Sequence, residues 1–75
     1  MDEYSWRADL VKAGIHITYI DMDNSLVYFD FAYRPHSGDQ RVWGKSVIRV
    51  EDLNGLRLVV ALKDEVLKLR KRLED

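Results

Sequence analysis

The sequence predicts an α+β fold, in which a small antiparallel sheet of three or four strands packs on one long C-terminal helix, with a short N-terminal helix also possible. Three observations predict it: apolar and polar residues alternate over Leu26–Arg34, a β-rich run lies on either side, and leucines recur at helical spacing near the C-terminus. The chain has 75 residues, enough for one domain with a single small core. We expect segments 1–13, 15–50 and 52–74 to form that domain.

The composition, 47% hydrophobic and 33% charged, is typical of a folded domain. Cysteine is absent, which excludes disulfides and thiolate sites. No apolar stretch approaches the roughly 18 residues of a membrane span, and the acidic start differs from a secretory signal. We therefore expect an intracellular protein, cytoplasmic or nuclear, without a membrane partner. So small a core seldom supplies more than about 3–5 kcal/mol, which favours support from a second subunit.

The first two elements follow from local patterns. Residues 2–13 fit a short amphipathic helix that Gly14 ends. Ile15–Asp21 is rich in β-branched and aromatic residues and predicts a strand, and Asp23–Ser25 supplies the following turn. The inward side chains of the helix would be Tyr4, Trp6, Leu10 and Val11.

The next two strands are predicted with their faces. In Leu26–Arg34, Val27, Phe29 and Phe31 alternate with Tyr28, Asp30 and Ala32. Pro35–Asp39 has loop composition. A third strand runs from Arg41 to about Val50. It points Val42, Ile48 and Val50 one way and Arg41, Trp43, Lys45 and Arg49 the other.

A long helix follows, from roughly Asp52 to Leu73, with Asp52 or Asn54 as its N-cap. Its apolar arc of about 220° exceeds the roughly 100° that one sheet needs, so we expect one row to contact the sheet and the other a second subunit. Alternatively, the N-terminal segment covers the surplus within a monomer. We assign the homodimer interface to the row Val59, Leu62, Val66, Leu69 and Leu73; the neighbouring row is Leu53, Leu56, Val60 and Leu67.

The charge pattern indicates a partner. Residues 31–50 carry four basic residues and one acidic residue, whereas the rest of the chain carries 8 basic and 12 acidic residues. If the helix covers the apolar sheet face, the other face is cationic and aromatic, as expected of a protein that stacks bases and neutralises phosphates of single-stranded DNA or RNA. The predicted members of that face are Tyr28, Arg34, Arg41, Trp43, Lys45 and Arg49, with His16 and Thr18 from the first strand.

Two alternatives remain open. The same face fits a small protein-interaction module, such as a viral or regulatory factor, that binds a partner protein. Arg, Lys and Tyr are also common on exposed strand faces without any binding role, because they have long side chains and favour the extended backbone conformation. The N-terminal segment could also cover Trp43. Asp30, inside an apolar strand, is either paired with Arg34 or Lys45 or simply exposed.

Catalytic and metal chemistry find little support. Asp21, Asp23 and Ser25 imitate a calcium loop, but Leu26 stands where its glycine belongs. His16 and His36 have no nucleophile fixed nearby except Ser37, and there is no glycine-rich phosphate loop. We expect no enzyme activity, cofactor or metal.

The order of strands, basic loop and long helix over about residues 15–73 resembles the positive cofactor four family of single-stranded DNA-binding transcriptional coactivators. Val27–Tyr33 is similar to the family's second strand, and Gly44–Ile48 to its glycine, basic, basic, glycine, isoleucine signature, with departures at Ser46 and Val47. The resemblance implies a homodimer formed through helices and a role in transcription, replication or repair. It also implies nucleic-acid contacts by Tyr33 and Lys45.

Overall fold

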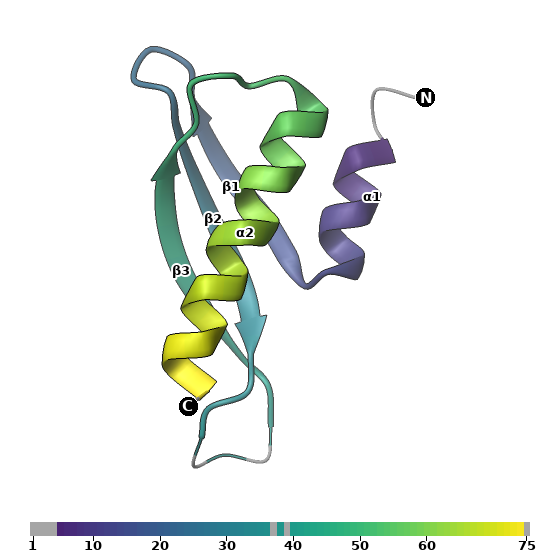
Figure 1. Cartoon of the computed structure of the whole chain (residues 1–75), viewed down its shortest axis with the longest axis vertical. Helices are drawn as coiled ribbons and strands as arrows, with labels where there is room; N and C mark the ends of the chain where they lie inside the picture. Colours follow the sequence, from purple (N-terminus) through teal and green to yellow (C-terminus); the bar gives the residue numbers. More distant parts are fainter. Residues whose placement is uncertain (1–4, 37, 39, 75) are drawn as a thin grey trace.

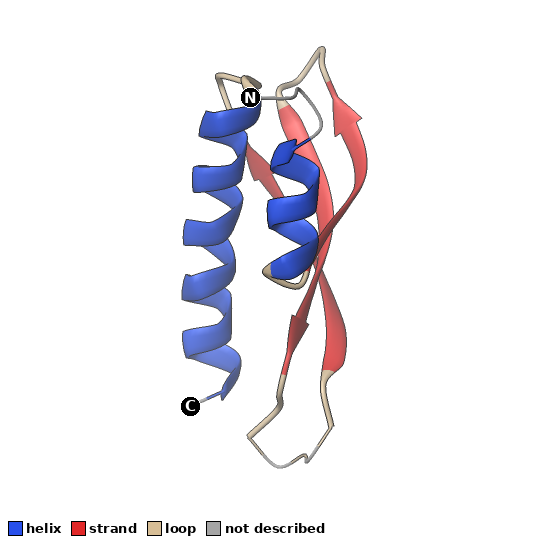
Figure 2. Ribbon diagram, turned by 90° about the vertical axis from the view of Figure 1, so that its right-hand side faces the viewer, coloured by secondary structure: helices blue, strands red, loops and turns tan. Residues whose placement is uncertain are grey.

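The chain folds into two layers, a three-stranded antiparallel sheet and a pair of helices, in a computed structural model that describes residues 5–36, 38 and 40–74 (Figure 1). The strand order is β1-β2-β3, and both helices lie on one face of the sheet (Figure 2). The predicted α+β class is confirmed, with three strands. In chain order the elements are α1 Ser5–Lys12, β1 Ile15–Asp21, β2 Leu26–Tyr33, β3 Val42–Arg49 and α2 Gly55–Glu74.

The predicted N-terminal helix is present as α1, although residues 2–4 of the prediction, including Tyr4, lie outside the described residues. Gly14 ends it as predicted, with a φ of 75° that glycine adopts without strain. Leu10 is buried in the core. Val11, predicted to point inward, is 66% exposed, because the short helix turns only a narrow stripe toward the other elements.

A tight turn joins β1 to β2. The carboxylate of Asp21 accepts hydrogen bonds from the backbone N–H groups of Asp23 (3.1 Å) and Asn24 (3.2 Å) and from the side-chain amide of Asn24 (2.9 Å). Ser25 takes the left-handed conformation, with φ at 56°. These bonds, the one from the Asn24 side chain first, lower the pKa of Asp21 below its ordinary value of 3.8. The residues predicted to form the turn do form it.

The β2–β3 connection and β3 lie close to their predicted positions, although Ser37 and Asp39 of the predicted loop are outside the described residues. Gly44 of β3 lies opposite Phe31 of β2. A Cβ atom on Gly44 would stand 2.8 Å from the Phe31 ring, closer than packed atoms approach. A glycine is therefore needed where the buried ring crosses β3.

Helix α2 begins at Gly55, because Asn54, one of the two predicted N-caps, is the residue that caps it. The Asn54 side-chain oxygen accepts a hydrogen bond from the Leu56 N–H (3.1 Å), whereas Asp52 accepts one from the Asn54 N–H (3.0 Å) and shapes the preceding turn. An added Cβ on Gly55 would lie 2.7 Å from Trp6. The glycine thus permits the close contact between α1 and the start of α2.

The row of α2 that was predicted to contact a second subunit packs against the chain's own sheet. Val59, Leu62 and Val66 are at most 7% exposed, Leu69 is half-buried, and Leu73, at the end, is 42% exposed. Four of these five residues, all but Leu73, therefore belong to the intramolecular layer, and the row cannot serve as the dimer interface. Exposure of 64–66% instead marks three members of the neighbouring row, Leu56, Val60 and Leu67.

The core lies between the inner sheet face and the helices. Neither described helix is both long and apolar enough to cross a bilayer. The buried cluster comprises Leu10, Ile15, Val27, Phe29, Phe31, Val50, Leu58, Val59, Leu62 and Val66.

Candidate functional site

The sheet face turned away from the helices is the candidate site, and we call it the outer face. The strand register shows which residues lie side by side on it. Asp30 of β2 pairs with His16 of β1 and with Lys45 of β3, and Tyr28 of β2 pairs with Tyr19 of β1 and Val47 of β3. Among the described residues, both helices lie on the other side of the sheet (Figure 2). The outer face comprises His16, Tyr19, Tyr28, Asp30, Trp43, Lys45, Val47 and Arg49.

The predicted alternation in β3 is confirmed at the residues that matter most. Trp43 is 61% exposed, and Lys45 and Arg49 are exposed on the same side of the strand, whereas Gly44 and Ile48 are partly buried beneath them. A tryptophan covered by the N-terminal segment would have been buried. Along β3 the outer face thus presents an indole ring and two cations within seven residues of one edge strand.

Tyr19 joins this face because of a β-bulge that the sequence did not predict. The register shifts between Ile17 and Tyr19, so Tyr19 pairs with Tyr28 and Thr18 occupies the irregular position. The Thr18 hydroxyl donates a hydrogen bond to the Tyr28 carbonyl (3.1 Å). The two tyrosine rings lie 5.8 Å apart at an interplanar angle of 48°. Strict alternation from His16 would have put Tyr19 inward, and no glycine or proline in β1 signals the bulge.

Tyr33, which the family resemblance implied as a contact, lies on the opposite face. It pairs with Val42, and its ring centroid is 5.5 Å from that of buried Phe31. Its half-buried ring packs against the core cluster. Tyr33 is therefore not part of the outer face, because its position in β2 has the parity of Phe29 and Phe31.

Two predicted arginines lie at the end of the sheet nearest the C-terminus of α2. The backbone N–H of Arg34 donates to a carboxylate oxygen of Glu74 (3.1 Å). Arg41 lines a hollow of about 390 Å³ there, which we call the end hollow. Three cations line it, Lys12 of α1, Arg41 of the β2–β3 connection and Arg70 of α2, against the one carboxylate of Glu74. The end hollow therefore concentrates positive charge at this end of the sheet.

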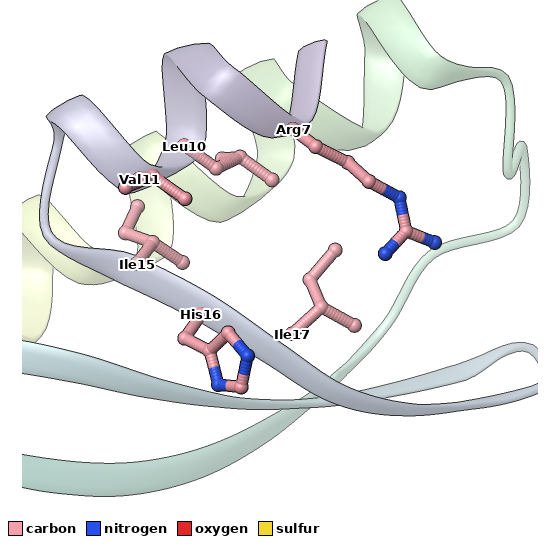
Figure 3. A pocket seen from close by; sticks show the side chains of 6 residues that line it. All are labelled: Arg7, Leu10, Val11, Ile15, His16 and Ile17. Atoms are coloured by element: carbon pink, nitrogen blue, oxygen red, sulfur yellow. The ribbon is translucent and has the colours of Figure 1, made fainter. Parts of the chain in front are cut away.

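A second, smaller hollow lies between α1 and β1 and holds about 140 Å³. Figure 3 shows the six residues that line it, Arg7, Leu10, Val11, Ile15, His16 and Ile17, with the His16 ring turned away from the other five across the β1 ribbon. The volume is below the roughly 300–1,000 Å³ of ordinary ligand pockets. The hollow is therefore not a candidate ligand site, and the His16 ring belongs to the outer face, where His16 pairs with Asp30.

No protein-family model matches the chain, and neither a curated protein nor a solved structure matches it. Within the described part of the chain, no group of His, Cys, Asp and Glu side chains is placed to hold a metal ion. The function is therefore inferred from the geometry and charge of the outer face.

Proposed function

We propose that the outer face binds single-stranded nucleic acid. The observation that supports this most directly is the exposure of Trp43 (61%), Tyr19 (62%) and Tyr28 (39%) on the same sheet face as Lys45 and Arg49. Single exposed rings are common on protein surfaces, but a cluster of them on one face marks an interaction site. Rings interspersed with cations are the arrangement by which proteins hold unpaired bases and their phosphates.

In the proposed mechanism, the rings and the cations act on different parts of the strand. A base that stacks on an aromatic side chain gains about 1–3 kcal/mol, and every base has a face to stack. Lys45 and Arg49 neutralise phosphates and release counterions, which makes binding weaker in salt. Arg41 and Lys12 in the end hollow extend the cationic path beyond β3, and exposed Arg34 lies near it.

The chain also offers a surface for a second copy of itself, and we propose a homodimer formed through it. Leu56, Val60 and Leu67 are 64–66% exposed and follow one another on α2 at spacings of four and seven residues. Residues so spaced lie along one side of a helix. A two-fold pair of such helices buries the same row on both protomers and leaves both outer faces free. The expected transcription, replication or repair role depends on the family resemblance and is part of this proposal.

A fluorescently labelled single-stranded oligonucleotide tests the binding. Its anisotropy should rise with protein, and log Kd should change linearly with log salt, with a slope of roughly 0.7 for each phosphate that is neutralised. Trp43→Ala should weaken binding by roughly 5- to 100-fold, since one stacking contact is lost. The exposed side chain makes no core contact, so circular dichroism should be unchanged.

A charge-matched pair of variants locates the surface. Lys45→Ala should weaken binding and reduce the salt slope by about one phosphate, whereas Lys68→Ala should change neither. Lys68 is an exposed helix residue whose ammonium group pairs with Asp64 at 3.3 Å. If both variants weakened binding equally, the oligonucleotide would be attracted by the overall charge of the protein and not by the outer face. No binding to any single strand would contradict the proposal and favour a protein partner on the same face.

A further inference from the structure

A hollow on the outer face collects three chemically different side chains, one from each strand. It holds about 430 Å³ and is lined by His16 of β1, Asp30 of β2 and Trp43 of β3. Asp30 lies in the middle strand, directly opposite His16 on one side and Lys45 on the other. Trp43 is two residues from Lys45 on the same face, so its ring stands diagonally from Asp30. The hollow thus has an aromatic wall beside a half-buried carboxylate.

Asp30 is the residue that phosphate binding does not explain. A carboxylate repels a phosphate, yet this one occupies the centre of the proposed binding face. The simplest structural explanation is a cross-strand ion pair with Lys45, but within the described residues Asp30 forms neither an ion pair nor a side-chain hydrogen bond. No partner among the described residues therefore competes with a ligand for the two carboxylate oxygens.

We propose that this hollow is a base-binding site that prefers guanine, an inference that rests on the proposed binding of single strands. The guanine ring stacks on Trp43 while its N1–H and N2 amino group donate two parallel hydrogen bonds to the Asp30 carboxylate. Such bidentate, charge-assisted pairs are strong and directional. Lys45 or His16, both next to Asp30, can donate to the guanine O6.

The other bases fit a carboxylate less well, because it only accepts hydrogen bonds. The Watson–Crick edges of adenine and cytosine each present one donor beside a ring-nitrogen acceptor. Thymine and uracil present one N–H between two carbonyl oxygens, which would face the negative charge. Guanine alone presents two adjacent donors on this edge, so one half-buried carboxylate suffices to distinguish it.

Oligothymidylates with a single central substitution test the preference without forming multistranded G structures. The strand with one guanine should bind about 10-fold tighter than the all-thymine strand, and those with one adenine or one cytosine should not. Inosine, which lacks the N2 amino group, should lose most of the gain. 7-Deazaguanine, which keeps both donors, should retain it, and loss of the gain with 7-deazaguanine would contradict recognition through this edge.

Asp30→Asn and Asp64→Asn form the matched protein pair. Asp30→Asn is nearly isosteric and should abolish the guanine preference while binding the all-thymine strand at least as tightly, because a negative charge has gone. Asp64→Asn removes the same charge on α2 and should keep the preference. Binding of all strands with equal affinity by the unaltered protein would overturn the guanine site and leave the proposed function standing. Failure to bind any strand would overturn both.

Discussion

At the scale of single residues, Arg70 shows how a surface-like side chain can set the geometry of the molecule. Its Nε donates to the Ala32 carbonyl and its Nη2 to the Ala13 carbonyl, each at 2.9 Å. One guanidinium therefore joins α2 to the end of β2 and to the segment after α1. In the sequence Arg70 is one of several basic residues near the C-terminus, and nothing there indicates these two contacts.

Replacing Arg70 by alanine should lower the free energy of unfolding by about 2–3 kcal/mol, since two charge-assisted hydrogen bonds are lost and the carbonyls of Ala13 and Ala32 lose a partner. Arg72→Ala, an exposed residue on the same turn, should change it by less than about 0.5 kcal/mol. Urea unfolding followed by tryptophan fluorescence at one fixed protein concentration measures both. Equal free energies of unfolding for the two variants would contradict this structural role of Arg70.

At the scale of elements, the β1–β2 hairpin should respond to acid through its turn. The pKa of Asp21 is lowered because its carboxylate accepts hydrogen bonds from the side chain and backbone of Asn24 and from the backbone of Asp23. Its folded pKa lies below its unfolded pKa, so this stabilisation is fully present above the unfolded pKa. It is lost as the pH falls through the lowered folded value.

The difference in urea midpoint between the unaltered protein and Asp21→Asn should therefore be constant near neutral pH and shrink below about pH 4. Asp23→Asn is the control, because it changes a charge in the same turn and leaves the acceptor oxygens of Asp21 in place. If the midpoint difference stays constant down to about pH 3, the turn bonds do not stabilise the ionised carboxylate.

Elements also show where local patterns stop being informative. The exposed side of β3 was predictable from its alternation, because a strand with one buried face must send Trp43 and Lys45 to the same side. The placement of Tyr19 on the outer face was not predictable, because a bulge depends on how two strands pair and β1 carries no residue that marks it. Tyr33 was expected at the site from family resemblance, against its own parity in β2.

At the scale of the whole molecule, the question is what covers the apolar row Leu56, Val60 and Leu67. If a second copy covers it, light scattering at micromolar concentration should give twice the protomer mass of 8.8 kDa. Leu67→Glu should then give the protomer mass, because a charge would be buried in the interface. Its fold should persist, since the side chain is 66% exposed in the protomer.

Val11→Glu is the matched control for that experiment. Val11 has the same 66% exposure on a helix but lies on α1, outside the row. It should leave the dimer intact. A protomer mass for the unaltered protein would contradict the dimer, and the row would then be a surface for a different partner.

The sequence by itself determined the α+β class, the order of the elements and the parity of β2 and β3, because these depend on side-chain periods of two and 3.6 residues that are local properties of the chain. Only the tertiary structure decided which row of α2 meets the sheet, since both rows are apolar and long-range contacts such as those of Arg70 select one. It also decided that Asp30 lines one hollow with His16 and Trp43, because three strands must come into register before those residues meet.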